Sequence, residues 1–210
     1  MVAAVVQLAV ALRQPLRRPL GAATEAVAAA VPPNILLASL DYTDVAWTKS
    51  RLSVQANAAA APGGAQTADK LVEDTTSGNH EVKQTFTKPA GVTQLFTSIA
   101  AKAAGRTQAY LNLDDNSSTN RAYIRLDLTT GAKLTSVVGT VGIVAHGADP
   151  LGDDWWRLWM VCSAPAEAGI YAIRPRVYAG AASYLGDGTS GILLARAQVH
   201  VSSRLLPYAY

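Results

Sequence analysis

The sequence predicts an all-β fold, an antiparallel jelly-roll β-sandwich that follows an extended, partly helical N-terminal arm. Three observations carry this prediction. After Asn34, apolar residues recur at every second position in short segments, turn residues separate these segments at intervals of about 8–12 residues, and no long amphipathic helix lies between them. The chain beyond the arm, about 175 of the 210 residues, is long enough for a jelly roll of about eight strands.

Each alternating segment is expected to turn one face into a core and the other face away from it. Trp47, which follows a loop and precedes a strand, and Cys162, which lies in an apolar row, are expected to be buried. The predicted inward rows are Leu52, Val54 and Ala56; Val82 and Phe86; Leu95, Thr97, Ile99 and Ala101; Ala109, Leu111 and Leu113; Ala122, Ile124, Leu126 and Leu128; Trp156, Leu158, Met160 and Cys162; Tyr171, Ile173 and Val177; and Leu193, Ala195, Ala197, Val199 and Val201.

Residues 1–33 differ from the rest of the chain, since they are built largely of Ala, Val and Leu and carry three arginines against one acid. The apolar opening ends at Arg13 and is too short for a membrane span of about 20 residues; its positive charges follow the apolar run, unlike those of a secretory signal. Four prolines leave room for a helix only at about residues 21–31. Because so short a helix is marginal in water, we expect the arm to dock on another protein, with packing against its own domain as the alternative.

The composition disfavours several classes of function. Eighteen basic and fifteen acidic residues give a net charge of only +3, which offers no basic patch for nucleic acid. The single cysteine, Cys162, excludes an internal disulfide framework, and His80, His146 and His200 lack the spacing of metal ligands. No phosphate-binding loop, dinucleotide fingerprint or nucleophile elbow occurs. We therefore expect a protein that is not an enzyme and that holds neither metal nor cofactor.

The outward positions of the predicted strands carry the candidate binding residues. If these strands share one sheet, aromatic rings, guanidinium groups and amides meet on its outer face. Sugar rings pack their C–H faces on aromatic side chains, and hydroxyls or uronic carboxylates pair with Asn, Asp or Arg, so such a face suits a polysaccharide. Tyr184 joins the set because it lies beside a glycine-rich turn, where sandwiches place ligand contacts. The candidates are Tyr110, Asn112, Tyr123, Arg125, Trp155, Arg157, Trp159, Arg174, Arg176 and Tyr184.

Two other interpretations of these residues stay open. Trp, Tyr and Arg are enriched at protein interfaces, so the same face would suit a contact between subunits. Alternatively, both faces of the strand near residues 155–162 are covered, and Trp155 and Trp159 are core residues.

The acidic residues of the loops are expected to shape turns. Asp114–Asp115, Asp153–Asp154 and Asp187 lie in turn segments, where aspartate usually accepts hydrogen bonds from its own backbone. Calcium binding is the alternative use of these oxygens, but none of them has EF-hand spacing. A glycosidase would need two carboxylates about 5–9.5 Å apart, and the sequence selects no pair from its fifteen acids.

Five segments resemble, in order and with similar spacing, a β-sandwich module of bacteriophage virion proteins, especially tail-fibre and spike-like proteins. They are NILLASLDYTDVAWTKSRLSVQANAAAAPGGAQTADKLVEDTTSGNH, AAKAAGRTQAYLNL, RLDLTTGAKL, GDDWWRLWMVCSAP and SYLGDGTSGILLARAQVHV. The module is similar in architecture to carbohydrate-binding jelly rolls. The resemblance covers residues 34 to about 201 and leaves out the arm.

The resemblance implies a virion protein in two parts, an anchoring arm at residues 1–33 and a displayed sandwich at residues 34–210. Such a protein is a fibre, spike or decoration subunit of a tailed phage or phage-like particle, made in the host cytoplasm and located in the virion. It is expected to be a homo-oligomer, to bind other virion proteins through its arm and to bind host surface polysaccharide. The alternatives are a soluble carbohydrate-binding module without a particle role and a glycan-cleaving enzyme. We expect neither nucleic-acid binding nor membrane insertion.

Overall fold

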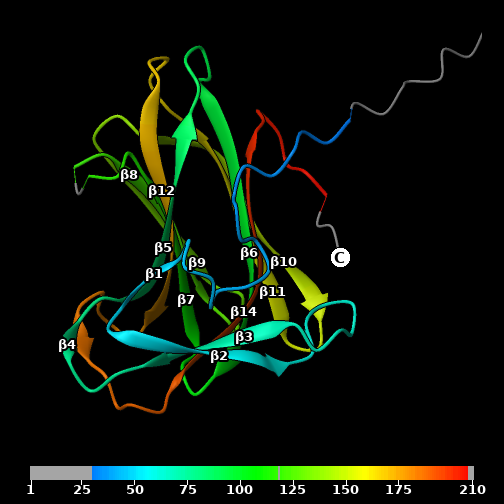
Figure 1. Ribbon diagram of the computed structural model, residues 1–210, viewed down its shortest axis with the longest axis vertical. Coiled ribbons are helices and arrows are strands. Elements are labelled where there is room, and N and C mark those ends of the chain that lie inside the picture. Colours follow the sequence, from blue (N-terminus) through cyan, green and yellow to red (C-terminus); the bar gives the residue numbers. More distant parts are fainter. Residues whose placement is uncertain (1–29, 118, 208–210) are drawn as a thin grey trace, which may run out of the picture. The chain divides into compact units, whose positions relative to one another are not determined.

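The computed structural model describes residues 30–117 and 119–207 (Figure 1). Contacts divide the chain into Met1–Ala30 and Val31–Tyr210, and the account below concerns the second unit. The predictions for the arm at residues 1–33, including its helix, lie almost entirely outside the described residues. Among the described residues, no helix is long and apolar enough to cross a membrane.

Two six-stranded antiparallel sheets form the described part of the chain (Figure 1). The first sheet has the strand order β1 (Thr48–Ser50), β5 (His80–Lys88), β12 (Gly169–Tyr178), β7 (Gln108–Asp114), β8 (Arg121–Asp127) and β9 (Lys133–Val138). The second has the order β10 (Gly142–Gly152), β11 (Trp155–Ser163), β6 (Gln94–Ala104), β14 (Gly191–Val201), β3 (Ala68–Glu73) and β2 (Leu52–Ala59). A short ribbon pairs β4 (Ser77–Gly78) with β13 (Tyr184–Leu185).

The strand pairing confirms the jelly roll. Strand β3 pairs with β14, β5 with β12, β6 with β11 and β7 with β8, so the first half of the chain pairs with the second half in nested order. This is the pairing of a long hairpin folded over into two sheets, which is how two Greek keys combine in a jelly roll.

The core lies between the two sheets and contains most of the predicted inward rows. Leu111 and Ile124 of the first sheet and Leu158 of the second belong to one cluster of fully buried side chains. Trp47 joins this cluster and donates a hydrogen bond from its Nε1 to the carbonyl of Ala38 at 2.6 Å, so its predicted burial is confirmed. Cys162 is also buried as predicted, and burial raises the pKa of its thiol to about 12.

The prediction of one continuous inward row in the last strand is wrong. Leu193 and Ala195 pack outside the second sheet, against Ala68, Ala100 and Trp155, whereas Ala197 and Val199 face the core. The cause is a β-bulge between Ala195 and Gln198, where the register of β14 against β6 shifts and Arg196 adopts a φ of 34°. A bulge adds one residue to one strand and so exchanges the two faces beyond it.

Beyond the bulge, β14 has a different neighbour. Its pairing with β3 ends at Leu194, and the segment that precedes Trp47, drawn in blue in Figure 1, then takes that side. The amide of Ile35 donates to Val199, and the amide of Ala197 donates to Ser39. The side chain of Asn34 donates to the carbonyl of Ala197 and accepts from the amide of Val199. The segment from Asn34 to Ser39 thereby satisfies a strand edge that would otherwise be unpaired.

Candidate functional site

The outer side of the first sheet brings aromatic, charged and amide side chains together. In the sheet register, Arg176 lies opposite both Glu81 and Tyr110, and Tyr110 also lies opposite Arg125. In the next row, Asn112 lies between Arg174 and Tyr123. We call this surface the first-sheet face, and its residues are Glu81, Tyr110, Asn112, Asp114, Tyr123, Arg125, Arg174, Arg176 and Tyr178.

Two arginines and two carboxylates form one ion-pair network on the first-sheet face. The Nε of Arg174 lies 2.6 Å from Oδ2 of Asp114, and its Nη1 lies 3.1 Å from Oε1 of Glu81. The Nε of Arg176 lies 2.5 Å from Oε2 of Glu81. Burial alone would lower the pKa of Arg174, but its pairing with Asp114 and Glu81 raises it. These charges hold one another in place, so the polar groups of the face are oriented in the free protein.

Three tyrosine rings lie beside this network. The ring of Tyr110 stacks on Tyr123 at a centroid distance of 4.4 Å and lies nearly parallel to Tyr178 at 6.2 Å. The guanidinium of Arg176 lies over the ring of Tyr110, and that of Arg125 lies over the ring of Tyr178. Burial, and then the neighbouring Tyr123, raise the pKa of Tyr110, which keeps its phenol neutral. The rings are thus fixed by stacking and by cation–π contacts.

A polar pocket of about 260 Å³ opens on the charged side of the first-sheet face. The amide of Asn112 is buried here; its Nδ2 donates to Asp114 at 2.5 Å, and its Oδ1 has no hydrogen-bond partner among the described residues. A buried acceptor without a partner costs stability, so it is expected where a ligand or water supplies the donor. The pocket is lined by Asn79, Glu81, Asn112, Asp114, Asn116, Ser117, Arg121, Arg174 and Arg176.

The structure brings six of the ten predicted binding residues together and separates the other four. The six on the first-sheet face are Tyr110, Asn112, Tyr123, Arg125, Arg174 and Arg176. Trp155, Arg157 and Trp159 lie on β11, which belongs to the second sheet, so the condition that all these strands share one sheet does not hold.

The outer side of the second sheet is packed rather than open. Trp155 is 3% exposed and Arg157 is 4% exposed, and the guanidinium of Arg157 lies over the fully buried ring of Phe96. Phe96 also packs with Val161 and Leu206, with Trp159 at the edge of that cluster. We call this surface the second-sheet face. Its burial matches the alternative in which Trp155 and Trp159 are packing residues.

Tyr184 lies on β13, outside both of these faces, and its side chain holds the neighbouring loop in place. Its hydroxyl donates to Oε2 of Glu73 at 2.6 Å, and its ring packs against His80 in a tilted arrangement, with a centroid distance of 4.5 Å and an interplanar angle of 45°. Arg106 donates to both oxygens of Glu73, and the amide of Asp187 donates to Oε1. Burial alone would raise the pKa of Glu73, but these hydrogen bonds lower it overall. The cluster fixes the chain around β13.

Aspartates shape several turns as predicted, but one of them belongs to the site. Asp187 accepts hydrogen bonds from the amides of Thr189 and Ser190, and Asp115 accepts from Ser117. Asp114 also shapes its turn, since it accepts from the amide of Asn116 at 2.8 Å, and it accepts from Arg174 as well. In residues 30–117 and 119–207, no three His, Cys, Asp or Glu side chains lie close enough to hold a metal ion.

The sequence interpretation missed three residues of the first-sheet face. The sequence predicts only the turn role of Asp114, and it gives no separate signal for Glu81 or Tyr178. Tyr178 follows Arg174 and Arg176 at the same spacing of two, so extending the outward row of β12 by one step would have included it. Glu81 similarly alternates with His80 and Val82 on β5.

No protein-family model matches the chain, and no curated protein matches it. Among solved structures, the carbohydrate-binding module TmCBM61 in complex with β-1,4-galactotriose is 13% identical with a TM-score of 0.45, over 80% of this chain and 97% of that one. The enzymatically active domain of tailspike protein 4 of bacteriophage CBA120 is 16% identical with a TM-score of 0.44, over 80% of this chain and 21% of that one. The CBM22-1–GH10 modules of Clostridium thermocellum xylanase 10B, complexed with xylohexaose, are 14% identical with a TM-score of 0.40, over 80% of this chain and 28% of that one. The chain therefore spans less than a third of the last two.

Proposed function

We propose that the β-sandwich binds carbohydrate through the first-sheet face. The observation that carries this proposal is the position of three stacked tyrosines next to a polar pocket in which Asn112 keeps an unpaired acceptor. A sugar ring has apolar C–H faces and hydroxyls that both donate and accept, so it needs aromatic surface together with donors and acceptors. The first-sheet face supplies both within neighbouring strands.

A subunit interface is the competing use of these residues, and the charge of the face favours the glycan. The buried centres of protein interfaces are poor in charged residues. The pocket on the first-sheet face is lined by charged residues that include Glu81, Asp114, Arg174 and Arg176, and its lining is mostly polar. Such a pocket matches a polyhydroxylated ligand better than it matches an apolar side chain.

We propose binding without cleavage. A glycosidase needs one of its two carboxyl groups to act as a proton donor. Glu81 and Asp114 both accept hydrogen bonds from Arg174, so both serve as acceptors in this arrangement.

We further propose that the protein is a structural subunit of a tailed-phage or phage-like particle, with the sandwich as its adhesive part. The ordered resemblance of residues 34–201 to virion modules supports this role. Many copies on a particle would convert weak single contacts into strong adhesion, since linked sites raise avidity by about 10²–10⁴. Light scattering on the full chain tests one requirement of this role: an oligomer is expected, and a monomer at all concentrations would count against it.

A glycan array probed with the full chain tests the carbohydrate proposal. Tyr123→Ala and Arg176→Gln each remove one contact of the first-sheet face, and each is expected to weaken binding about 30-fold, the effect of an interface residue worth about 2 kcal/mol. Lys133→Gln, which removes one exposed charge from the neighbouring edge strand β9, serves as the control and should bind normally. Glycan binding that survives both face variants would show that the ligand lies elsewhere.

A further inference from the structure

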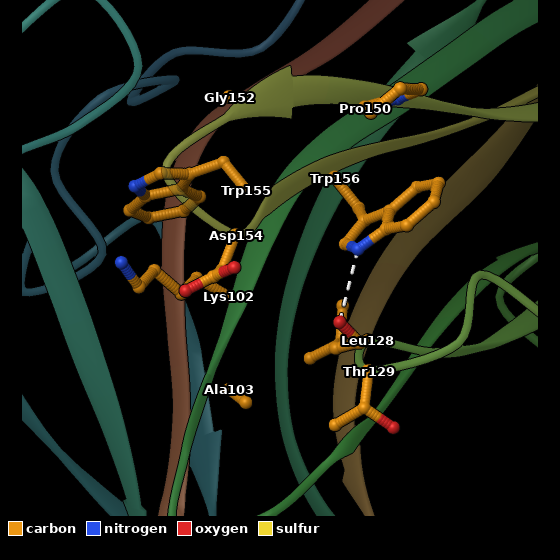
Figure 2. A pocket seen from close by; sticks show the side chains of 9 residues that line it. All are labelled: Lys102, Ala103, Leu128, Thr129, Pro150, Gly152, Asp154, Trp155 and Trp156. Carbon is orange, nitrogen blue, oxygen red and sulfur yellow. Dashed lines mark hydrogen bonds between the residues drawn. The ribbon is translucent and has the colours of Figure 1, made fainter.

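A second cavity, of about 480 Å³, lies at the end of the β10–β11 hairpin, and we call it the end cleft (Figure 2). It combines residues of the second sheet with the turn that follows β8, and it shares no lining residue with the first-sheet face. In Figure 2, Trp155, Asp154 and Lys102 lie on one side of the end cleft, and Trp156, Leu128 and Thr129 lie on the other. Its lining is Lys102, Ala103, Leu128, Thr129, Pro150, Gly152, Asp154, Trp155 and Trp156.

The walls of the end cleft are held in place by the fold. The Nε1 of Trp156 donates to the carbonyl of Leu128 at 3.0 Å, which ties the hairpin to the turn after β8 (Figure 2). The same indole covers Gly131, where an added Cβ would lie 2.5 Å from the ring. On the other wall, Nζ of Lys102 donates to the carbonyl of Asp153 at 2.6 Å. A cavity that is already formed in the free protein is typical of a small-molecule site.

The lining restricts the chemistry of the ligand. Lys102 and Asp154 contribute opposite charges, so an anion would meet the carboxylate of Asp154 and a cation would meet the ammonium of Lys102. The Lys102 ammonium donates to the carbonyl of Asp153 and the Thr129 hydroxyl donates to Oδ1 of Asp127, so a purely apolar ligand would leave the carboxylate of Asp154 facing it without a partner. The half-buried indole of Trp156, together with Leu128 and Ala103, requires an apolar surface on the ligand.

We propose that the end cleft is a second carbohydrate site, which holds a short, uncharged saccharide. A pyranose unit has an apolar face for the indole and hydroxyls for Asp154, Lys102 and Thr129. The volume falls in the lower half of the range for small-molecule pockets, about 300–1,000 Å³, so the site takes a short saccharide rather than a long stretch of chain. The proposal does not depend on the function of the first-sheet face.

Indole N–H resonances of the full chain test this proposal directly, because the protein has only four tryptophans. They are assigned with Trp→Phe variants and followed while galactose, glucose, lactose or cellobiose is added, with glucuronate as the charged comparison. The resonance of Trp156 is expected to shift with at least one neutral saccharide, while that of Trp47, in the core, stays unchanged.

Two exposed residues and one neighbour sharpen the test. Asp154→Asn and Thr129→Val should each weaken the saccharide affinity measured at Trp156 about tenfold, the loss of one hydrogen bond to a bound ligand. Asp153→Asn is the matched control: Asp153 and Asp154 both have positive φ, which Asn tolerates, but only Asp154 lines the end cleft. Tyr123→Ala, on the first-sheet face, should leave the Trp156 shift unchanged, so failure at one site is distinguishable from failure at the other.

Three outcomes would overturn the proposal. The first is that none of the neutral saccharides shifts the Trp156 resonance. The second is that only glucuronate shifts it, which would make the end cleft an anion site. The third is that Asp154→Asn and Thr129→Val retain the affinity of the unchanged protein.

Discussion

The two outer faces of the sandwich carry similar residues in different surroundings. Each carries aromatic rings and arginines at alternating positions of a strand. On the second-sheet face, Arg157 is buried and lies over a buried phenylalanine, whereas on the first-sheet face Arg174 is half-buried and lines a pocket. The difference teaches that alternation identifies outward residues, while the cover above them decides whether they line a pocket or pack against other side chains.

The largest expected effect is a difference in the free energy of unfolding between variants of the two faces. Trp155→Ala should lower the free energy of unfolding by about 3–5 kcal/mol, because the indole is buried against Ala100, Leu193 and Ala195 and leaves a cavity. Tyr123→Ala should cost much less, about 1 kcal/mol, since its ring is only half buried. Urea unfolding measures both. Similar losses for the two variants would mean that the faces do not differ in the way described.

A buried cation on the inner side of the first sheet gives a further comparison. Lys88 is fully buried on β5, and its Nζ donates to the carbonyls of Val92 at 2.8 Å, Glu167 at 2.6 Å and Pro89 at 3.3 Å. Lys88→Met should destabilise the protein by about 2–4 kcal/mol, because it leaves these carbonyls without a donor. The control is Lys133→Gln on the edge strand β9, where the side chain is exposed and the free energy of unfolding should stay unchanged. If the Lys88→Met protein were as stable as the unchanged protein, Lys88 would not be needed to satisfy these loop carbonyls.

Acid should weaken the protein through its lowered carboxyl pKa values. The pKa of Glu73 in the folded protein lies below its ordinary value of 4.5, so this group adds stability above that pH and loses it as the pH falls further. The midpoint of urea unfolding should therefore drop as the pH is lowered from about 5 to 3. Glu73→Gln should flatten this drop, whereas Glu167→Gln, at an exposed position, should keep it.

The fold was predictable because alternation is a local property of each strand. The core rows at Leu111, Ile124 and Leu158 follow from a period of two, and these three residues are buried together. The bulge of β14 was not predictable in the same way, because the residue with positive φ is Arg196 and not a glycine, which would have indicated a bulge. Where a bulge inserts such a residue, the inward positions of the strand continue on the opposite face of the alternating pattern.

The site was predictable only in part, because sheet membership depends on pairing between distant segments. Arg157 and Arg176 both occupy outward positions, yet β11 pairs with β6 and β10 while β12 pairs with β5 and β7. Nothing within either strand distinguishes these partners. Glu81 entered the site for the same reason, since only the pairing of β5 with β12 brings it to Arg176.

The smallest expected effect concerns one hydroxyl at the edge of the first-sheet face. The Tyr178 hydroxyl accepts a hydrogen bond from Nη1 of Arg125 at 2.7 Å and donates one to the carbonyl of Gly180 at 2.9 Å. Tyr178→Phe keeps the ring that faces Tyr110 but removes both bonds, so it should cost about 1 kcal/mol of stability. If the ring provides the sugar-packing surface, glycan affinity should fall less in Tyr178→Phe than in Tyr178→Ala. Equal losses in a glycan-binding titration would instead assign the contact to the hydroxyl and to the guanidinium that it orients.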